Sequence, residues 1–147
     1  NIRFTDRIKI MKVGSGIEIL DPYEWLPGHG ENAVKIRTEG TELIVAVMYD
    51  CDAGTCEREL RFGSVCSFYS QIFPGPSMLE IEGVEAAMIL RGVLIEYPAS
   101  EAAMAWSQHF GSSSTIQQYS IVFLAENLLL VVLAGSVVLN ESASRVR

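Results

Sequence analysis

The chain has 147 residues, of which 49% are apolar, and a formal net charge of −7. This length and apolar content suit a single domain with a substantial core and argue against intrinsic disorder. The negative charge argues against a nucleic-acid-binding protein, because phosphate recognition needs a concentrated basic surface.

Apolar runs alternate with short turn clusters at a spacing that is typical of antiparallel β structure. The predicted strands are 3–12, 16–20, 33–38, 42–51, 56–62, 65–70, 77–82, 88–97, 118–125 and 128–139. The turn clusters are "GSG" at 14–16, "LPGHGEN" at 26–32, "TEGTE" at 38–42 and "FPGPS" at 73–77. The stretch "DPYEWL" predicts a short helical turn, with Asp21 as its cap and Pro22 in the first helical position.

The stretch "YDCDAGTCEREL" at 49–60 predicts a β-hairpin in which Cys51 lies opposite Cys56 and Tyr49 lies opposite Arg58. In this register apolar side chains share one face and charged side chains share the other: Val45, Val47, Leu60 and Phe62 against Glu57, Glu59 and Arg61. Gly54 supplies the positive φ that a short hairpin loop needs. The sorting explains the acids and cysteines of this stretch without any ligand.

Metal sites are the alternative explanation of the same stretch. A calcium-binding EF-hand loop needs glycine at its sixth position and glutamate at its twelfth, where this chain has Thr55 and Arg61. A zinc site needs four ligands, and the chain offers three cysteines and two distant histidines. We therefore expect neither a metal nor another cofactor.

The cysteine count bears on the cellular compartment. Three cysteines cannot all pair within the chain, which favours a reducing compartment over a secreted scaffold. We therefore expect a cytoplasmic protein with free thiols at Cys51 and Cys56. A cross-strand disulfide between these two residues is the alternative.

One helix, at about 99–110, is predicted from "PASEAAMAWSQHFG". Ser100 is the expected N-cap, Glu101 suits the positive end of the helix dipole, and Gly111 is the expected stop. The apolar side chains recur at three- and four-residue steps and should cover a sheet face: Ala103, Trp106 and Phe110.

The apolar region "SIVFLAENLLLVVLAGSVVL" is about as long as a membrane span. Glu126 and Asn127 lie near its middle, where a charge is costly in lipid, so we expect a hairpin of two buried strands and no membrane span. The second half is apolar on both faces. Either it is central in a two-layer structure, or this hairpin or the strand 88–97 forms the contact of a homodimer, which we expect.

These elements together predict an α+β domain that is mainly β. The expected architecture is a curved antiparallel sheet, an open β-sandwich or a partial barrel with one covering helix. A single domain should span residues 1–139, followed by a flexible tail at 140–147.

A candidate binding surface combines a glycine-flanked loop histidine with aromatic residues of nearby loops and strands: His29, Tyr23, Trp25, Phe68, Tyr69 and Phe73. No G-x-S-x-G motif or phosphate-binding loop occurs in the sequence, so we expect no catalytic residues. The enzymatic alternative uses His29 with a nearby carboxylate, Glu31 or Glu24.

The C-terminal third, "LIEYPASEAAMAWSQHFGSSSTIQQYSIVFLAENLLLVVLAGSVVLNE", resembles the end of small β-rich bacterial domains of unassigned role, some of which are immunity-type partners of toxins. The shared outline is a strand, a short helix carrying a tryptophan, and a closing hairpin. The resemblance implies a bacterial protein-binding domain without catalytic residues.

The expected function is therefore non-catalytic binding of another protein, in an immunity-type or accessory role. An acidic surface would speed the encounter with a basic partner through electrostatic steering. The alternatives are a small-molecule or lipid-binding module, and the enzyme built on His29.

Overall fold

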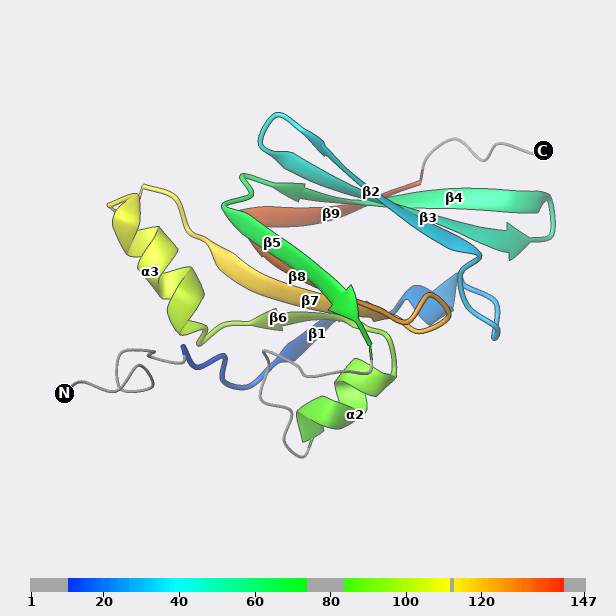
Figure 1. The fold of residues 1–147 in the computed structure, drawn as a ribbon, viewed down its shortest axis with the longest axis horizontal. Coiled ribbons are helices and arrows are strands. Elements are labelled where there is room, and N and C mark those ends of the chain that lie inside the picture. Colours follow the sequence, from blue (N-terminus) through cyan, green and yellow to red (C-terminus); the bar gives the residue numbers. More distant parts are fainter. Residues whose placement is uncertain (1–10, 74–83, 112, 142–147) are drawn as a thin grey trace.

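The computed structural model describes residues 11–73, 84–111 and 113–141, which form two antiparallel sheets and two α-helices (Figure 1). Sheet A contains, in spatial order, β1 (Ile17–Leu20), β6 (Leu94–Tyr97), β7 (Gln117–Phe123), β8 (Leu128–Ala134) and β5 (Ser67–Ile72). Sheet B contains β2 (Ala33–Glu39), β3 (Glu42–Cys51), β4 (Gly54–Gly63) and β9 (Ser136–Glu141). The predicted mainly β, α+β fold is confirmed, in the form of an open sandwich.

The two sheets are joined at a corner through which two paired strands pass together. The chain runs from β4 into β5 and from β8 into β9, and β4 pairs with β9 while β5 pairs with β8. Backbone hydrogen bonds continue through the corner, from Gly135 N to Gly63 O (2.8 Å) and from Cys66 N to Leu133 O (2.8 Å). A Cβ atom at Gly135 would lie 3.2 Å from the Cβ of Ser64, so glycine permits this close approach.

The main core fills the space between the sheets. Strand alternation turns one face of each strand inward, where apolar side chains lose contact with water. Sheet B contributes Leu43, Val45, Val47, Tyr49, Leu60 and Phe62, and sheet A contributes Leu94, Tyr119, Ile121, Phe123, Leu130, Val132 and Ala134. The predicted apolar face of the 43–62 hairpin is therefore confirmed.

The opposite face of sheet A carries a second apolar cluster. It contains Ile89, Val93, Ile95, Tyr97, Val122, Leu129 and Val131. The helix α2 (Val84–Leu90) contributes Ile89 to this cluster and lies on the side of sheet A away from sheet B (Figure 1). Both faces of β7 and β8 are thus covered within one chain. This agrees with the first of the two alternatives for this hairpin, a central place in a two-layer structure.

The second helix, α3 (Glu101–His109), is confirmed with its predicted cap. Ser100 Oγ accepts a hydrogen bond from Ala103 N (3.1 Å), and Gly111 follows the helix with a φ of 61°. Ala103 is buried, whereas Trp106 is half-buried and Phe110 remains exposed. The predicted helical turn after Asp21 is also present, as the 3₁₀-helix η1 (Pro22–Glu24), with the Asp21 side chain accepting from Tyr23 N.

Several predicted boundaries are wrong. The described residues form two α-helices where one was predicted, because residues 84–90 are helical and β6 begins only at Leu94. The predicted strand 128–139 is divided at Gly135 between the two sheets. Pairing of β9 with β4 continues to Glu141, past the predicted end of this strand at 139. The predicted strand 77–82, residues 3–10 of the predicted strand 3–12 and the tail residues 142–147 lie outside the described residues, and Met11 and Lys12 are not in a strand.

Candidate functional site

A two-stranded ribbon projects from one end of sheet B. The strand β2 pairs with β3 only as far as Ala33 opposite Met48, and β9 pairs with β4 only from Glu141 opposite Arg58. Residues 49–57, which we call the β3–β4 tip, therefore extend beyond both flanking strands (Figure 1). A ribbon of two strands on its own is only marginally stable in water, so other contacts must hold the tip.

A disulfide links the two strands of the tip. Cys51 and Cys56 are bonded, with their Cα atoms 6.0 Å apart. Our expectation of free thiols at these positions is therefore wrong. Cys51 pairs with Gly54 and Cys56 with Tyr49, so the cysteines are diagonal neighbours on one face and their side chains can meet.

The predicted register of the hairpin is wrong by two residues. Val47, and not Tyr49, lies opposite Arg58, and Val45 lies opposite Leu60. A shift of two residues leaves every side chain on its original face, which is why the apolar and charged sets were assigned correctly. The loop is shorter than predicted, because Asp52 and Ala53 form the turn and Gly54 has a φ of 110°.

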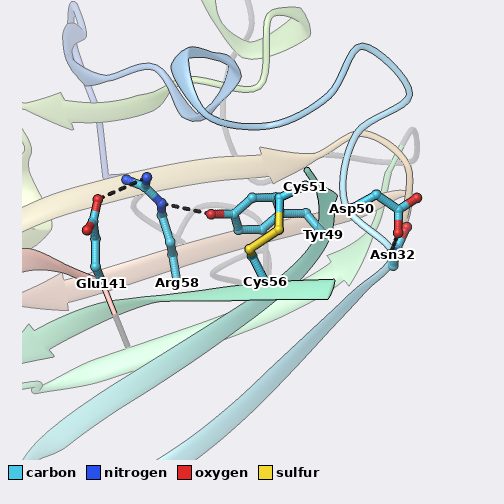
Figure 2. Close-up of a disulfide and its surroundings, with 7 residues drawn as sticks. All are labelled: Asn32, Tyr49, Asp50, Cys51, Cys56, Arg58 and Glu141. Carbon is cyan, nitrogen blue, oxygen red and sulfur yellow. Dashed lines mark hydrogen bonds and ion pairs between the residues drawn. A yellow bond between two sulfur atoms is a disulfide. The ribbon is translucent and has the colours of Figure 1, made fainter. Parts of the chain in front are cut away.

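The inner side of the tip is packed with aromatic side chains. The Tyr49 ring is buried beside Trp25, with ring centroids 5.0 Å apart, and the Arg58 guanidinium lies 5.0 Å above the Trp25 ring. Arg58 Nε donates to Tyr49 Oη (3.0 Å), and its Nη2 pairs with Glu141 Oε1 (2.9 Å), as Figure 2 shows. These contacts fix the base of the tip against the loop that follows η1.

The outer side of the tip carries an exposed polar cluster. Asp50 Oδ1 accepts a hydrogen bond from Asn32 Nδ2 (2.7 Å), and Asp50 Oδ2 lies 3.1 Å from His29 Nε2. The side chains of His29 and Asp50 are 63% and 57% exposed, so water surrounds both. The hydrogen bond from Asn32, followed by the contact with His29, lowers the pKa of Asp50 below its ordinary value of 3.8.

Replacing Asn32 with alanine is expected to raise the pKa of Asp50 toward 3.8, since the hydrogen bond from Asn32 is the largest cause of the shift. A carboxyl whose pKa is lowered by folding contributes stability above its unfolded pKa and loses that contribution as pH falls through the folded pKa. The attachment of the tip to the 26–32 loop should therefore weaken below about pH 4. An NMR titration of the Asp50 carboxyl carbon measures the effect, and an unchanged midpoint in Asn32→Ala would contradict it. The variant His29→Ala is expected to give a smaller rise.

The six predicted surface residues do not form one groove. His29 and Trp25 lie at the β3–β4 tip, on its outer and inner sides. Tyr23 is half-buried, and burial together with Glu31 raises the pKa of its hydroxyl. Phe68 is 40% exposed on β5, whereas Tyr69 and Phe73 pack against the apolar cluster on the far face of sheet A. Of the six predicted surface residues, His29 and Trp25 therefore lie at the tip, and the other four lie elsewhere.

The carboxylate that contacts His29 is Asp50, and neither Glu31 nor Glu24 shows such a contact. Glu31 is buried, and its Oε1 accepts a hydrogen bond from Glu126 N (2.9 Å), which ties the 26–32 loop to the turn between β7 and β8. The register explains this pairing, because Ala33 opposite Met48 brings the loop that precedes β2 beside Asp50.

A hydrolytic site needs a nucleophile beside its histidine. Among the described residues, no serine, threonine or cysteine side chain is hydrogen-bonded to His29. The free cysteine, Cys66, lies at the corner between β4 and β5, and burial raises the pKa of its thiol. Cys66 lines an open cleft of about 290 Å³ with Thr38, Glu42 and Phe68. The described ranges contain no group of three or more histidine, cysteine, aspartate or glutamate side chains placed to hold a metal ion.

No family model, curated protein or solved structure matches the chain. The geometry of the site must therefore support any functional proposal by itself. No helix within residues 11–73, 84–111 and 113–141 is long and apolar enough to cross a membrane.

Proposed function

We propose that this domain is a non-catalytic module that binds another protein, and that the β3–β4 tip is its contact surface. The observation that carries the proposal is the form of the tip. It is a projecting ribbon, closed by a disulfide and fixed at its base by Trp25, Asn32 and Arg58. A preordered surface loses little conformational freedom on binding, which favours affinity.

The charge of the tip indicates the chemistry of the partner. Residues 49–57 contain three acidic side chains, Asp50, Asp52 and Glu57, and no basic one. Together with the net charge of −7, this favours a partner with a basic surface, because complementary charge speeds the encounter and selects against acidic partners. An immunity-type role, as the resemblance of the C-terminal third implies, is one form of such binding.

The cysteines do not support the expected cytoplasmic location. That expectation rested on an odd number of cysteines with free thiols, but Cys51 and Cys56 are paired and only Cys66 is free. A disulfide persists best in an oxidising environment. The homodimer stays a prediction, and the apolar β7–β8 hairpin that suggested it is covered within the chain.

The small-molecule alternative has one observation in its favour, the cleft lined by Phe68 and Cys66. Its volume of about 290 Å³ lies at the lower end of the range for ligand pockets, and it is open to solvent. Native mass spectrometry of the purified protein would detect a retained ligand as additional mass.

The protein-binding proposal is tested by cross-linking and affinity capture from the source organism. The double variant Asp50→Asn, Asp52→Asn removes two charges from the tip. It should weaken capture of a specific partner by about tenfold, and more at low ionic strength than at high. The double variant Glu39→Gln, Glu42→Gln is the matched control, because it removes the same charge at the other end of β3. Equal losses in the two variants would show that net charge, and not the tip, determines binding.

A further inference from the structure

The disulfide lies toward the end of the tip, beyond the polar and aromatic contacts that hold its base. Trp25 contacts Tyr49, and the 26–32 loop contacts Asp50, at the base of the ribbon. Within the described chain, the side chains from Asp52 to Thr55 make no hydrogen bond or ion pair, so the Cys51–Cys56 bond is the side-chain link that closes the end of the ribbon. Because an isolated two-stranded ribbon is marginally stable, the order of this segment depends on that bond.

A small reductant can reach the disulfide. Cys51 and Cys56 pack against the main core, but both are only half-buried, near the end of a ribbon that projects from the sandwich. Partly exposed disulfides of this kind are the ones that are reduced most readily in proteins.

The arrangement also favours re-formation of the same bond. After reduction, the two thiols stay only five residues apart in the sequence, at the end of two strands that remain paired below the tip, so oxidation would be intramolecular. The third cysteine, Cys66, lies beyond the opposite end of β4, about 30 Å along that strand from the tip. It cannot compete for either partner while the sandwich is folded.

We propose that the Cys51–Cys56 disulfide is a reversible redox switch for the β3–β4 tip. Its oxidised form holds the tip in a fixed, binding-competent conformation, and its reduced form lets the end of the tip, residues 51–56, unpair while both sheets stay intact. The link to binding, though not the switch in conformation, rests on the function proposed above. The rest of β3 and β4 is flanked by β2 and β9, so loss of the cross-link should not spread into the sandwich.

The reductant is a dithiol, and the reaction is thiol–disulfide exchange. One thiolate of the dithiol attacks a cystine sulfur, which forms a mixed disulfide and releases the other cysteine sulfur to take up a proton. The second thiol of the reductant then displaces the remaining cysteine sulfur. In total, two electrons and two protons pass to the protein, and the dithiol becomes a cyclic disulfide. A low-molecular-weight disulfide reverses the reaction.

Hydrogen–deuterium exchange of the whole protein, before and after reduction with dithiothreitol, tests the switch without any partner. Cys66→Ser serves as the background, so that only one cystine can change. On reduction, amides of residues 51–56 should exchange about thirtyfold faster, as expected when a short cross-link is lost, while amides of β7 and β8 keep their protection. The variant Cys51→Ala, Cys56→Ala should behave as the reduced protein does in both redox conditions.

Two results would overturn the proposal. Unchanged exchange at the tip would mean that the ribbon is ordered without the disulfide, and a similar rise in every strand would mean that the bond supports the whole fold. The capture experiment, repeated with oxidised and reduced protein, should lose the partner on reduction. A partner that is never captured would reject the binding function while leaving the exchange result, and thus the conformational switch, standing.

Discussion

Replacing Phe62 with alanine is expected to lower the free energy of unfolding by about 3–5 kcal/mol. The Phe62 side chain is fully buried between the two sheets, and its ring centroid lies 5.7 Å from that of Tyr119 in the opposite sheet. Truncation removes the apolar surface that folding buries and leaves a cavity that both sheets would have to move to close. Urea denaturation, followed by circular dichroism, measures the change.

The control for this substitution is Val138→Ala, on the strand paired with β4. Val138 is 53% exposed, so its truncation should change stability by about 0.5 kcal/mol or less. Phe62→Leu should fall between the two, because it retains most of the volume. A loss below about 1 kcal/mol in Phe62→Ala would mean that the sheets pack less closely at this position than the structure indicates.

Replacing Ser100 with alanine is expected to cost about 2–4 kcal/mol, an unusually large effect for the loss of one hydroxyl. The Ser100 side chain is fully buried and makes two hydrogen bonds. Its Oγ accepts from Ala103 N (3.1 Å) as the N-cap of α3 and donates to Gln118 Oε1 (2.5 Å) on β7. Alanine removes the cap and leaves the buried Gln118 oxygen without this donor, and the two penalties add.

A double-mutant cycle with Gln118→Met separates these two contributions. If the unpaired oxygen is part of the cost, the double variant should be destabilised by less than the sum of the single variants. Ser113→Ala is the control, because Ser113 is exposed and its hydroxyl bonds only to Phe110 O near the end of α3. Strict additivity in the cycle, measured by urea denaturation, would limit the role of Ser100 to the cap.

Local sequence patterns predicted several strands of the sandwich well. The bounds of β3, Glu42–Cys51, follow from a continuous apolar run between two turn clusters, and the sorting of Leu60 and Glu59 to opposite faces of β4 follows from alternation. The cap of α3 was also predictable, because the requirement for an acceptor at Ser100 is local. These features depend on neighbours in sequence, which a pattern can represent.

The errors arise where the pattern is the same for two structures. The apolar residues Met88 to Leu90 fit a buried strand and a short helix equally well, and the helix was not recognised. The shift of two residues between β3 and β4 preserves every face, so alternation cannot detect it. Turn geometry, through Gly54, decides the register and with it the diagonal position of the two cysteines.

The contact between His29 and Asp50 shows a second limit of sequence reasoning. The two residues are separated by 21 positions, and they meet because β2 and β3 pair with Ala33 opposite Met48. Periodicity identifies each strand but not the register between strands, so the loop histidine was given the wrong carboxylate. The role of Arg58, which contacts Trp25, Tyr49 and Glu141 together, required the same long-range information.

The corner at Gly135 has a consequence for how the molecule responds to heat or denaturant. One strand pair belongs to both layers, and its hydrogen-bonded ladder is continuous from β5 and β8 into β4 and β9. Neither layer can melt first without breaking this shared ladder and exposing the other layer's apolar face to water. Probes placed in the two layers should therefore report a single, coincident transition, and the end of the projecting ribbon is free to open in advance of it.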